Sequence, residues 1–303
     1  MTDEKLLMSE AANLYYKKNL TQQEIASLMG LTRQTVSKLL SDAVRENIVE
    51  ITIHNPEITR NNLSGKICEK YGIKEAVICS VSNDNEELRR LMTVKSAAEY
   101  LVPLFKLGGQ NIAVSWGRTV KALIEEMPET ATENNTVFPL FGATDNVEEY
   151  FLSNSLARGM ADKFSATLKY AWFPYLPEKQ TDAELFKKTS YYEGIKELWN
   201  NIDIAVVGIG NTDILRLFES NFNRPKTENE IIGDIATHFF SQDGKLVELF
   251  TNSLCASAEN IKKAGKTVAI ACSDNKIKAI SGALKTGLID ILVTDEYTAE
   301  KLI

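Results

Sequence analysis

The sequence is poor in the residues that build metal centres and disulfide frameworks. It holds only two histidines, His54 and His238, which excludes a histidine-rich metal centre. Its four cysteines are Cys68, Cys79, Cys255 and Cys272. They lack the close spacing of zinc ligands and of a disulfide scaffold, so the pattern predicts reduced structural thiols. We therefore expect no metal and no cofactor.

Long apolar runs are also missing. No run approaches the ~20 residues that a membrane span requires. The first five residues have neither the basic nor the apolar region of a signal peptide. These absences predict a cytoplasmic protein without a membrane partner. A hydrophobic content of 44% is ordinary for a globular protein, and a length of 303 residues suggests two domains.

Basic residues are outnumbered, since 34 Lys and Arg stand against 41 Asp and Glu, for a net charge of −7. This balance excludes a protein that coats nucleic acid nonspecifically, because phosphate contacts supply most of such affinity. Residues 32–45 differ from this acidic balance, because they hold the basic Arg33, Lys38 and Arg45 and only one acidic residue, Asp42. So small a patch binds DNA weakly, which favours an oligomer that presents several copies to one operator.

Residues 20–45 have the pattern of a helix-turn-helix. Thr21 precedes Glu24 by three positions, which is the capping-box spacing and predicts a helix start. The inward face of this helix is predicted to hold Ile25, Ala26 and Leu28. Gly30 then supplies the turn, and Thr32 supplies the N-cap oxygen of a second helix. Val36, Leu39, Leu40 and Ala43 repeat at helical spacing in that second helix.

The outer face of the second helix has the side chains that DNA recognition requires. Arg33 and Gln34 can reach base edges, whereas Ser37, Lys38 and the helix N-terminus suit phosphates. The full set of predicted DNA contacts is Thr21, Gln22, Thr32, Arg33, Gln34, Thr35, Ser37 and Lys38. Two alternatives stay open: a merely solvated helix face, and a winged-helix module that has lost its DNA and kept its packing.

The segments around this motif complete a DNA-binding domain over residues 1–55. A helix is predicted over 5–18, packed behind the other two. Residues 48–54 alternate apolar and polar positions, which predicts a short wing strand after a helix end at Asn47. Residues 56–64 are predicted to be the linker, and 56–303 to be the second domain.

The second domain alternates apolar strands with helices. Strands are predicted over 75–81, 110–114, 136–140, 202–207, 266–270 and 289–293, with helices over 63–71, 85–106 and 120–127. Several of these strands run into Gly, Ser, Thr or Asp. This order predicts an α/β domain with a doubly wound, mostly parallel sheet. In such sheets ligands bind at the carboxyl ends of the strands.

The loop Ser115-Trp116-Gly117-Arg118-Thr119 is the best candidate for an anion site. It combines a strand end, a glycine, hydroxyl groups, a guanidinium group and a helix N-terminus. The alternative is an ordinary strand-to-helix turn. Lys276 can add a second positive charge, although by itself it is better explained as a surface lysine.

Asp234, which follows Gly233 and is framed by isoleucines, is unlike a plain surface residue. It can accept hydrogen bonds from sugar hydroxyls, or it can cap a helix. Residues 172–177 form an apolar loop that can close over a sugar ring or pack in the core. Asp243-Gly244 predicts a turn.

Together these residues resemble the SorC family of bacterial transcription regulators along the whole chain. The motifs that carry the resemblance are Leu14-Tyr15-Tyr16, Leu20-Thr21-Gln22-Gln23-Glu24-Ile25-Ala26, Val36-Ser37-Lys38-Leu39-Leu40, Val114-Ser115-Trp116-Gly117, Val207-Gly208-Ile209-Gly210, Gly233-Asp234-Ile235, Asp243-Gly244, Lys276 with Ala279-Ile280, and Leu292-Val293-Thr294-Asp295. They span both domains in the right order, which is more specific than any one of them.

The resemblance implies a DNA-binding head on a domain similar in fold to sugar-phosphate isomerases and deaminases, usually assembled as a tetramer. It implies a phosphorylated sugar as effector. Carried across, the phosphate contacts Ser115, Gly117, Arg118, Thr119 and Lys276, and Asp234 faces the sugar. The effector set is completed by the strand-end glycines Gly142, Gly208 and Gly210.

Two departures from the family pattern bear on the ligand. Some relatives carry a lysine in the second loop that can form a Schiff base with an aldehyde, whereas this chain has Phe141 followed by Gly142. Covalent sensing is therefore not expected. Cys272-Ser273 and Ala143 replace glycines of the family, which leaves less room near the backbone.

The sequence thus predicts a homotetrameric regulator, expected to be a repressor, of a carbohydrate catabolic operon, with operator DNA and a phosphorylated sugar or polyol as partners. It is not expected to be an enzyme. The rival interpretation is a sugar-phosphate isomerase or deaminase that carries a DNA-binding head. Such chemistry needs a general base, and beside His238 the domain offers only carboxylates, of which Asp234 can serve.

Overall fold

The computed structural model of the chain describes residues 3–51, 60–144, 148, 150, 152–213, 215 and 230–303. The chain divides into two compact units, Met1–Pro56 and Glu57–Ile303, and each has its own hydrophobic core. The first unit is called the head below, and the second the sheet domain.

The head is built from three helices. Helix α1 spans Asp3–Ala12 and continues into one π-helical turn, η1, over Asn13–Lys17. Helix α2 spans Gln22–Met29 and helix α3 spans Arg33–Arg45. The predicted helix-turn-helix and the helix that precedes it are therefore confirmed.

Local side-chain chemistry sets the ends of α2 and α3. The Thr21 hydroxyl accepts the Glu24 backbone N–H at 3.3 Å, and the Glu24 carboxylate accepts the Thr21 N–H at 2.8 Å. Gly30 ends α2 with a positive φ of 66°, a conformation that costs glycine little. The Thr32 hydroxyl then accepts the Thr35 N–H at 3.1 Å. The capping box and the cap of α3 are thus as predicted.

The head core confirms most of the predicted inward positions. Its buried residues are Met8, Ala11, Ala12, Ile25, Ala26, Val36, Leu39, Leu40 and Ala43. The prediction for Leu28 is wrong, because this side chain is 68% exposed. Helix α2 has only eight residues and packs against α3 and η1, so one side of it is covered and Leu28 lies off that side.

The predicted wing strand and linker need correction. Asn47 has the expected left-handed conformation, with φ at 56°. The backbone N–H groups of Ile48 and Val49 then turn back to the Ala43 carbonyl, at 2.8 and 3.0 Å, so residues 48–51 are irregular and form no strand. Residues 52–54 lie outside the described residues, as do 56–59 of the predicted linker. Residues 60–64 are helical, because helix α4 spans Arg60–Tyr71.

The sheet domain contains a ten-stranded sheet in which seven strands follow the order β1-β10-β9-β5-β2-β3-β4 and pair in parallel. These strands are β1 Glu75–Cys79, β2 Asn111–Val114, β3 Thr136–Pro139, β4 Thr167–Leu168, β5 Ile204–Asn211, β9 Lys266–Ile270 and β10 Ile291–Asp295. The predicted mostly parallel sheet is confirmed. Side chains of β9 and β10 are almost all buried, as expected for strands covered on both faces.

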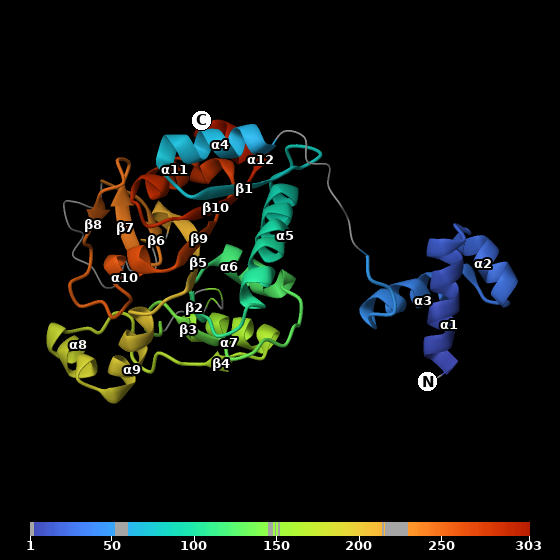
Figure 1. Ribbon diagram of the computed structural model, residues 1–303, viewed down its shortest axis with the longest axis horizontal. Helices are drawn as coiled ribbons and strands as arrows, with labels where there is room; N and C mark the ends of the chain where they lie inside the picture. The colour runs from blue at the N-terminus through green and yellow to red at the C-terminus, as the bar shows by residue number, and fades with distance from the viewer. Residues whose placement is uncertain are drawn as a thin grey trace. The chain divides into compact units, whose positions relative to one another are not determined.

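Helices cover the sheet in two groups (Figure 1). The helices of the sheet domain, besides α4, are α5 Glu86–Phe105, α6 Arg118–Glu126, α7 Ser153–Phe164, α8 Gln180–Lys187, α9 Ser190–Trp199, α10 Ala258–Lys263, α11 Ile277–Lys285 and α12 Glu296–Leu302, with a 3-10 turn, η5, over Asp274–Lys276. Helices α5, α6 and α7 pack side by side, and so do α4, α12 and α11. Strand β1 contacts both α4 and α5, so both faces of the sheet are covered.

An antiparallel ribbon departs from the predicted topology. It consists of β6 Ile231–Ile235, β7 His238–Ser241 and β8 Leu246–Val247, and β6 pairs antiparallel with the end of β5. Asp234 is therefore in a strand, so the alternative of a helix cap is wrong. Glycines allow this approach, because a Cβ atom on Gly233 would lie 2.4 Å from the Gly210 carbonyl oxygen. The turn predicted at Asp243-Gly244 is present, with Gly244 at φ 79°.

Candidate functional site

The exposed face of α3 keeps its polar side chains available. Thr32, Arg33, Gln34, Thr35, Ser37 and Lys38 are all exposed, as is Thr21, while Gln22 is half-buried. No hydrogen bond or ion pair engages the side chains of Arg33, Gln34 or Lys38 within the described residues. Asp42 is buried and pairs with Arg45 at 2.7 Å. The net positive charge on this helix is therefore that of Arg33 and Lys38, a smaller patch than the sequence suggests.

A cavity of about 460 Å³ lies at the carboxyl ends of the three neighbouring strands β2, β5 and β9. Eight of the nine predicted effector residues line it: Ser115, Gly117, Arg118, Thr119, Gly208, Gly210, Asp234 and Lys276. They come from four segments that are distant in sequence. The sheet topology brings them together, because parallel neighbours end at one edge.

Gly142 is the exception and does not line the cavity. A Cβ atom at this position would lie 2.6 Å from the Pro174 carbonyl carbon and 2.7 Å from the Phe173 carbonyl oxygen. Its N–H donates to the Leu254 carbonyl at 2.9 Å. Gly142 therefore allows two chain segments to approach closely, and it lies outside the lining of the cavity.

The loop after β2 has the geometry of an anion site. Gly117 adopts φ 112° and stands at the N-cap of α6, so the first turn of that helix opens on the cavity. Unsatisfied N–H groups and the helix dipole attract anions there. The Arg118 guanidinium lies 5.3 Å from the centre of the Tyr150 ring. Ser115 is buried, and its N–H donates to the Val206 carbonyl at 2.9 Å, which fixes the loop to β5.

Asp234 is the buried acid of the cavity. It is 3% exposed, and its carboxylate accepts the Thr237 N–H at 3.2 Å. Gly210 faces it on the paired strand, where a Cβ atom would lie 1.9 Å from Asp234 Oδ1. Burial raises the pKa of Asp234 to about 6, against the opposing effects of the Thr237 N–H and the Lys276 charge.

Lys276 supplies the second positive charge. Its ammonium donates to the Ile209 carbonyl at 2.9 Å, which holds it over the end of β5 instead of in solvent. Burial lowers the pKa of Lys276, and the nearby Cys272 and Asp234 groups oppose that shift. The alternative of an ordinary surface lysine is therefore wrong. Arg118 and Lys276 line one cavity, and a ligand anion there would favour the charged form of Lys276.

Sequence reasoning missed several lining residues. These are Trp116, Glu148, Tyr150, Ile209, Asn211, Asp213, Ala236 and Asn275. Asn211 and Asp213 follow the Gly208-Ile209-Gly210 strand end, and Asn275 precedes Lys276, so proximity in sequence was an available signal for them. Glu148 and Tyr150 had no such sequence signal, because no strand or helix pattern surrounds them.

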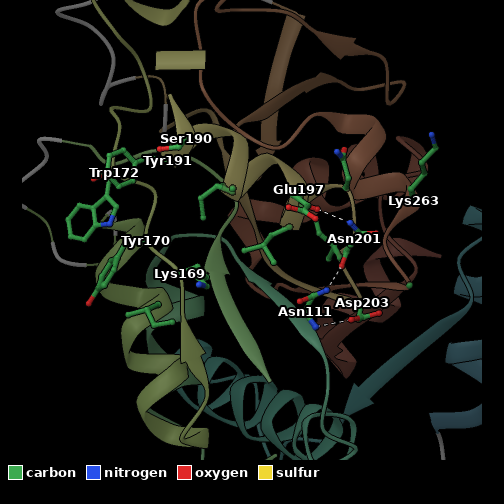
Figure 2. Close-up of a pocket in the computed structure, with 17 residues that line it drawn as sticks. Asn111, Lys169, Tyr170, Trp172, Ser190, Tyr191, Glu197, Asn201, Asp203 and Lys263 are labelled. Carbon is green, nitrogen blue, oxygen red and sulfur yellow. Dashed lines mark hydrogen bonds between the residues drawn. The ribbon is translucent and has the colours of Figure 1, made fainter. Parts of the chain in front are cut away.

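A larger hollow of about 1130 Å³ lies at the opposite, amino ends of the strands (Figure 2). The Asn111 N–H donates to the Asp203 carboxylate at 2.7 Å, and the Asn111 amide donates to the Asn201 carbonyl at 2.9 Å. Of its two lysines, Lys263 is paired with Glu259 at 3.2 Å. The smaller cavity, with two basic side chains and a helix N-terminus in its lining, is the better candidate for an anion site.

The apolar loop 172–177 does not line the cavity at the ends of β2, β5 and β9. Phe173 and Tyr175 are buried in the core, whereas Trp172 is 61% exposed and lines the hollow of Figure 2. Of the two roles predicted for this loop, Phe173 and Tyr175 have the one of core packing.

In the described part of the chain, no helix is both long and apolar enough to span a membrane, and no group of three or more His, Cys, Asp or Glu side chains can hold a metal ion.

A helix-turn-helix head joined to an α/β domain with a cavity at its strand ends defines the class of ligand-responsive DNA-binding regulators. Residues 56–303 match the family model described as "Putative sugar-binding domain", and residues 5–63 match a Crp-like helix-turn-helix domain. The chain belongs to the SorC family of transcription regulators.

Individual relatives extend over both domains. The sorbitol operon regulator of Klebsiella pneumoniae is 29% identical over 312 residues, with 100% of this chain and 99% of the relative covered. The deoxyribonucleoside regulator of Bacillus subtilis is 26% identical, with 98% and 97% covered. The crystal structure of the full-length Klebsiella regulator has a TM-score of 0.77 at 28% identity and covers 98% of this chain and 97% of its own.

The first prediction concerns the pH dependence of stability. Because the pKa of Asp234 is about 6 in the folded protein and near 3.9 when unfolded, ionisation opposes folding increasingly as pH rises from about 4 to 6. Asp234→Asn should therefore stabilise the ligand-free protein by ~1–2 kcal/mol more at pH 7.5 than at pH 5. Urea unfolding at both pH values measures this, and an equal effect at the two would contradict the burial argument.

The second prediction uses two cavity glycines as a matched pair. Gly210→Ala places a methyl group 1.9 Å from Asp234 Oδ1, whereas Gly208→Ala meets nothing closer than the Trp116 carbonyl oxygen at 3.7 Å. Gly210→Ala should cost ~1–3 kcal/mol of stability through overpacking, and Gly208→Ala much less. Denaturant midpoints of the two variants test this. Equal losses would mean that the close packing of Asp234 on Gly210 is unimportant.

Proposed function

We propose that the chain is a transcription regulator of a carbohydrate catabolic operon, whose head binds operator DNA and whose sheet domain binds a phosphorylated sugar or polyol. The observation that carries the proposal is the composition of the 460 Å³ cavity. It combines a helix N-terminus, Arg118 and Lys276, which suit a phosphate, with the buried carboxylate of Asp234, which suits hydroxyl groups.

The relatives support a sugar or polyol as the effector class. Their names describe regulators of a sorbitol operon, of deoxyribonucleosides and of erythritol catabolism. Each name points to a small polyhydroxylated compound or to a nucleoside that contains a sugar. We carry this over to the present chain as the class of effector, with the phosphate assigned on the chemistry of the cavity.

The proposed DNA contacts are Thr21, Gln22, Thr32, Arg33, Gln34, Thr35, Ser37 and Lys38. The exposure of all of them except the half-buried Gln22 supports this, as does the N-terminus of α3, which is capped by the neutral Thr32 hydroxyl and is free of acids in its first turn. With net charge confined to Arg33 and Lys38, one head binds weakly. The proposal therefore includes a cytoplasmic homotetramer that acts as a repressor and presents several heads to one operator.

Regulation by the effector then follows from linkage. An effector that binds one arrangement of the tetramer more tightly shifts the population of DNA-competent heads, by no more than its differential affinity. Effector binding through Ser115, Gly117, Arg118, Thr119, Gly208, Gly210, Asp234 and Lys276 needs no covalent step. Phe141 stands where a Schiff-base lysine would be required, and it is buried with its ring 4.5 Å from that of Trp116.

Catalysis is the second candidate function, and the pKa of Asp234 is the observation that favours it. A buried carboxyl group with a pKa of about 6 is suited to act as a general base near neutral pH. We propose that the chain is not an enzyme, in line with relatives that are named as regulators. Turnover of sugar phosphates that Asp234→Asn abolishes would overturn this.

The third prediction tests the recognition helix. Arg33→Ala and Gln34→Ala should each weaken specific operator binding by ~1–3 kcal/mol and relax base preference, because each removes a side chain able to contact base edges. Fluorescence anisotropy at fixed salt measures the affinity. Lys278→Ala, an exposed charge change on α11, is the control and should leave operator binding unchanged. Unaltered binding in both head variants would remove α3 as the DNA reader.

The fourth prediction tests the effector. A thermal-shift screen with D-sorbitol 6-phosphate, D-fructose 6-phosphate and their unphosphorylated forms should find stabilisation by phosphorylated compounds only. A ligand at a hundred times its Kd stabilises by ~2.7 kcal/mol. The shift should be lost in Arg118→Ala and in Lys276→Ala and kept in Lys278→Ala. Equal shifts with unphosphorylated forms, or in the cavity variants, would rule out the phosphate site.

A further inference from the structure

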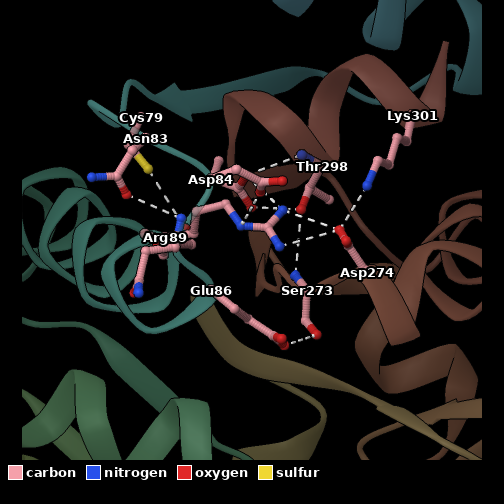
Figure 3. Close-up of polar contacts among 12 residues, drawn as sticks. Cys79, Asn83, Asp84, Glu86, Arg89, Ser273, Asp274, Thr298 and Lys301 are labelled. Atoms are coloured by element: carbon pink, nitrogen blue, oxygen red, sulfur yellow. Dashed lines mark hydrogen bonds and ion pairs between the residues drawn. The ribbon is translucent and has the colours of Figure 1, made fainter.

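A buried arginine lies next to the anion cavity without lining it. Arg89, the fourth residue of α5, is 2% exposed and lies near the carboxylates of Asp84, Asp274 and Asp295, the first two of which are labelled in Figure 3. Its guanidinium donates to Asp274 at 3.1 and 3.2 Å and approaches Asp295 at 3.6 Å. Arg89 Nε makes only a longer, 3.4 Å approach to Asp84. Because Arg89 is buried, loss of a carboxylate partner would leave its charge less well compensated, so Arg89 favours the present position of Asp274.

Asp274 connects this arginine to the ligand cavity. It begins the turn η5, whose next two residues, Asn275 and Lys276, both line the cavity. Its carboxylate also accepts a hydrogen bond from the Lys301 ammonium on α12, at 2.8 Å. Hydrogen bonds from Lys301 and Arg89 hold the pKa of Asp274 below its usual range, so it stays ionised. One carboxylate thus joins the cavity loop to α5 and to α12.

The residue before Asp274 is held in a strained conformation. Ser273 has φ 111° and ψ 141°, close to the φ 112° of Gly117 in the other cavity loop. A side chain rarely adopts this conformation, and it persists only where the surroundings impose it. Here the Ser273 N–H donates to the Thr298 hydroxyl at 3.3 Å, and the Ser273 hydroxyl is bonded to Glu86. Contacts from α12 and α5 therefore hold the loop in place.

Helix α12 leads in turn to α4. The Lys70 ammonium on α4 donates to the carbonyl groups of Leu302 and Ile303 at 2.9 and 2.7 Å. The Tyr71 hydroxyl donates to the Leu302 carbonyl at 2.9 Å. Helix α4 is the first described helix after the head in sequence. Polar contacts, with the backbone of α12 between Lys301 and Leu302, thus connect the loop beside the cavity to the helix that follows the head in sequence.

We propose that Arg89, Asp274 and Lys301 form a positioning cluster that holds the strained loop 273–276 against the cavity and couples its state to α12 and α4. A ligand that moves Lys276 then also shifts Asp274, which lies two residues earlier in the same turn. The strained backbone at Ser273 favours movement of the loop to a second conformation. The identity of the ligand, and the effect on DNA, rest on the proposed function. The coupling of loop 273–276 to α12 and α4 within the sheet domain does not rest on it.

Hydrogen exchange followed by mass spectrometry on the full, ligand-free chain tests the link directly. Asp274→Asn keeps the shape of the side chain and removes its charge. It should speed exchange about tenfold in 273–276, in α12 and in α4, and leave α6 unchanged. Asp162→Asn, which breaks the exposed Arg158–Asp162 pair at 3.4 Å on α7, is the matched control. Faster exchange confined to 273–276, or none, would overturn the coupling.

A second arm adds inorganic phosphate as the probe. In the wild type, phosphate should slow exchange in 115–119, 273–276 and α4. Lys301→Gln, which cuts the link to α12 and leaves Arg89 on Asp274, should keep the first two effects and lose the effect in α4. An unchanged α4 response would overturn the proposal. If phosphate protects nothing in the wild type, the anion site fails, and the ligand-free comparison still decides the coupling.

Discussion

The burial of the Asp234 carboxylate against Gly210 is the constraint on which the cavity at the strand ends depends. It requires a glycine at 210, because any side chain would occupy the space of Asp234 Oδ1, and a glycine at 233, because the two strands approach so closely. It also places Asp234 near Lys276, and burial disfavours the charged form of both. Burial raises the pKa of Asp234 and lowers the pKa of Lys276. A ligand that carries both an anion and hydroxyl groups relieves both costs at once.

The parallel sheet makes this arrangement possible. Strands β2, β5 and β9 are adjacent, so a helix N-terminus, a glycine-rich strand end and a lysine-bearing turn meet although they are far apart in sequence. The antiparallel ribbon then closes the space by carrying Asp234 over the end of β5. The cavity is thus built from the standard strand ends of a doubly wound sheet and one inserted ribbon.

Short-range sequence signals predicted much of the head and of the cavity. The Thr21–Glu24 spacing, the strand ends and the glycine of the Ser115–Thr119 loop act within a few residues, and the structure places them as expected. The predictions that did not hold depend on packing and hydrogen bonds that no sequence pattern shows. The irregular course of residues 48–51 follows from bonds back to Ala43, the exposure of Leu28 from what covers α2, and the place of Gly142 from its approach to Phe173 and Pro174. The roles of Arg89 and Ser273 were invisible because each is defined by partners nearly 200 positions away.

The pairing of β1 with β10 has a consequence for synthesis. Glu75 finds its sheet partner, Ile291, only after the whole intervening chain has been made, whereas the contacts of the head span fewer than fifty residues. Closing so long a loop delays the sheet domain, and local contacts let the head form early. On the ribosome, the head should therefore emerge and fold well before the sheet domain can close its sheet. Translation thus includes an interval in which the helix-turn-helix is folded and the sheet domain is not.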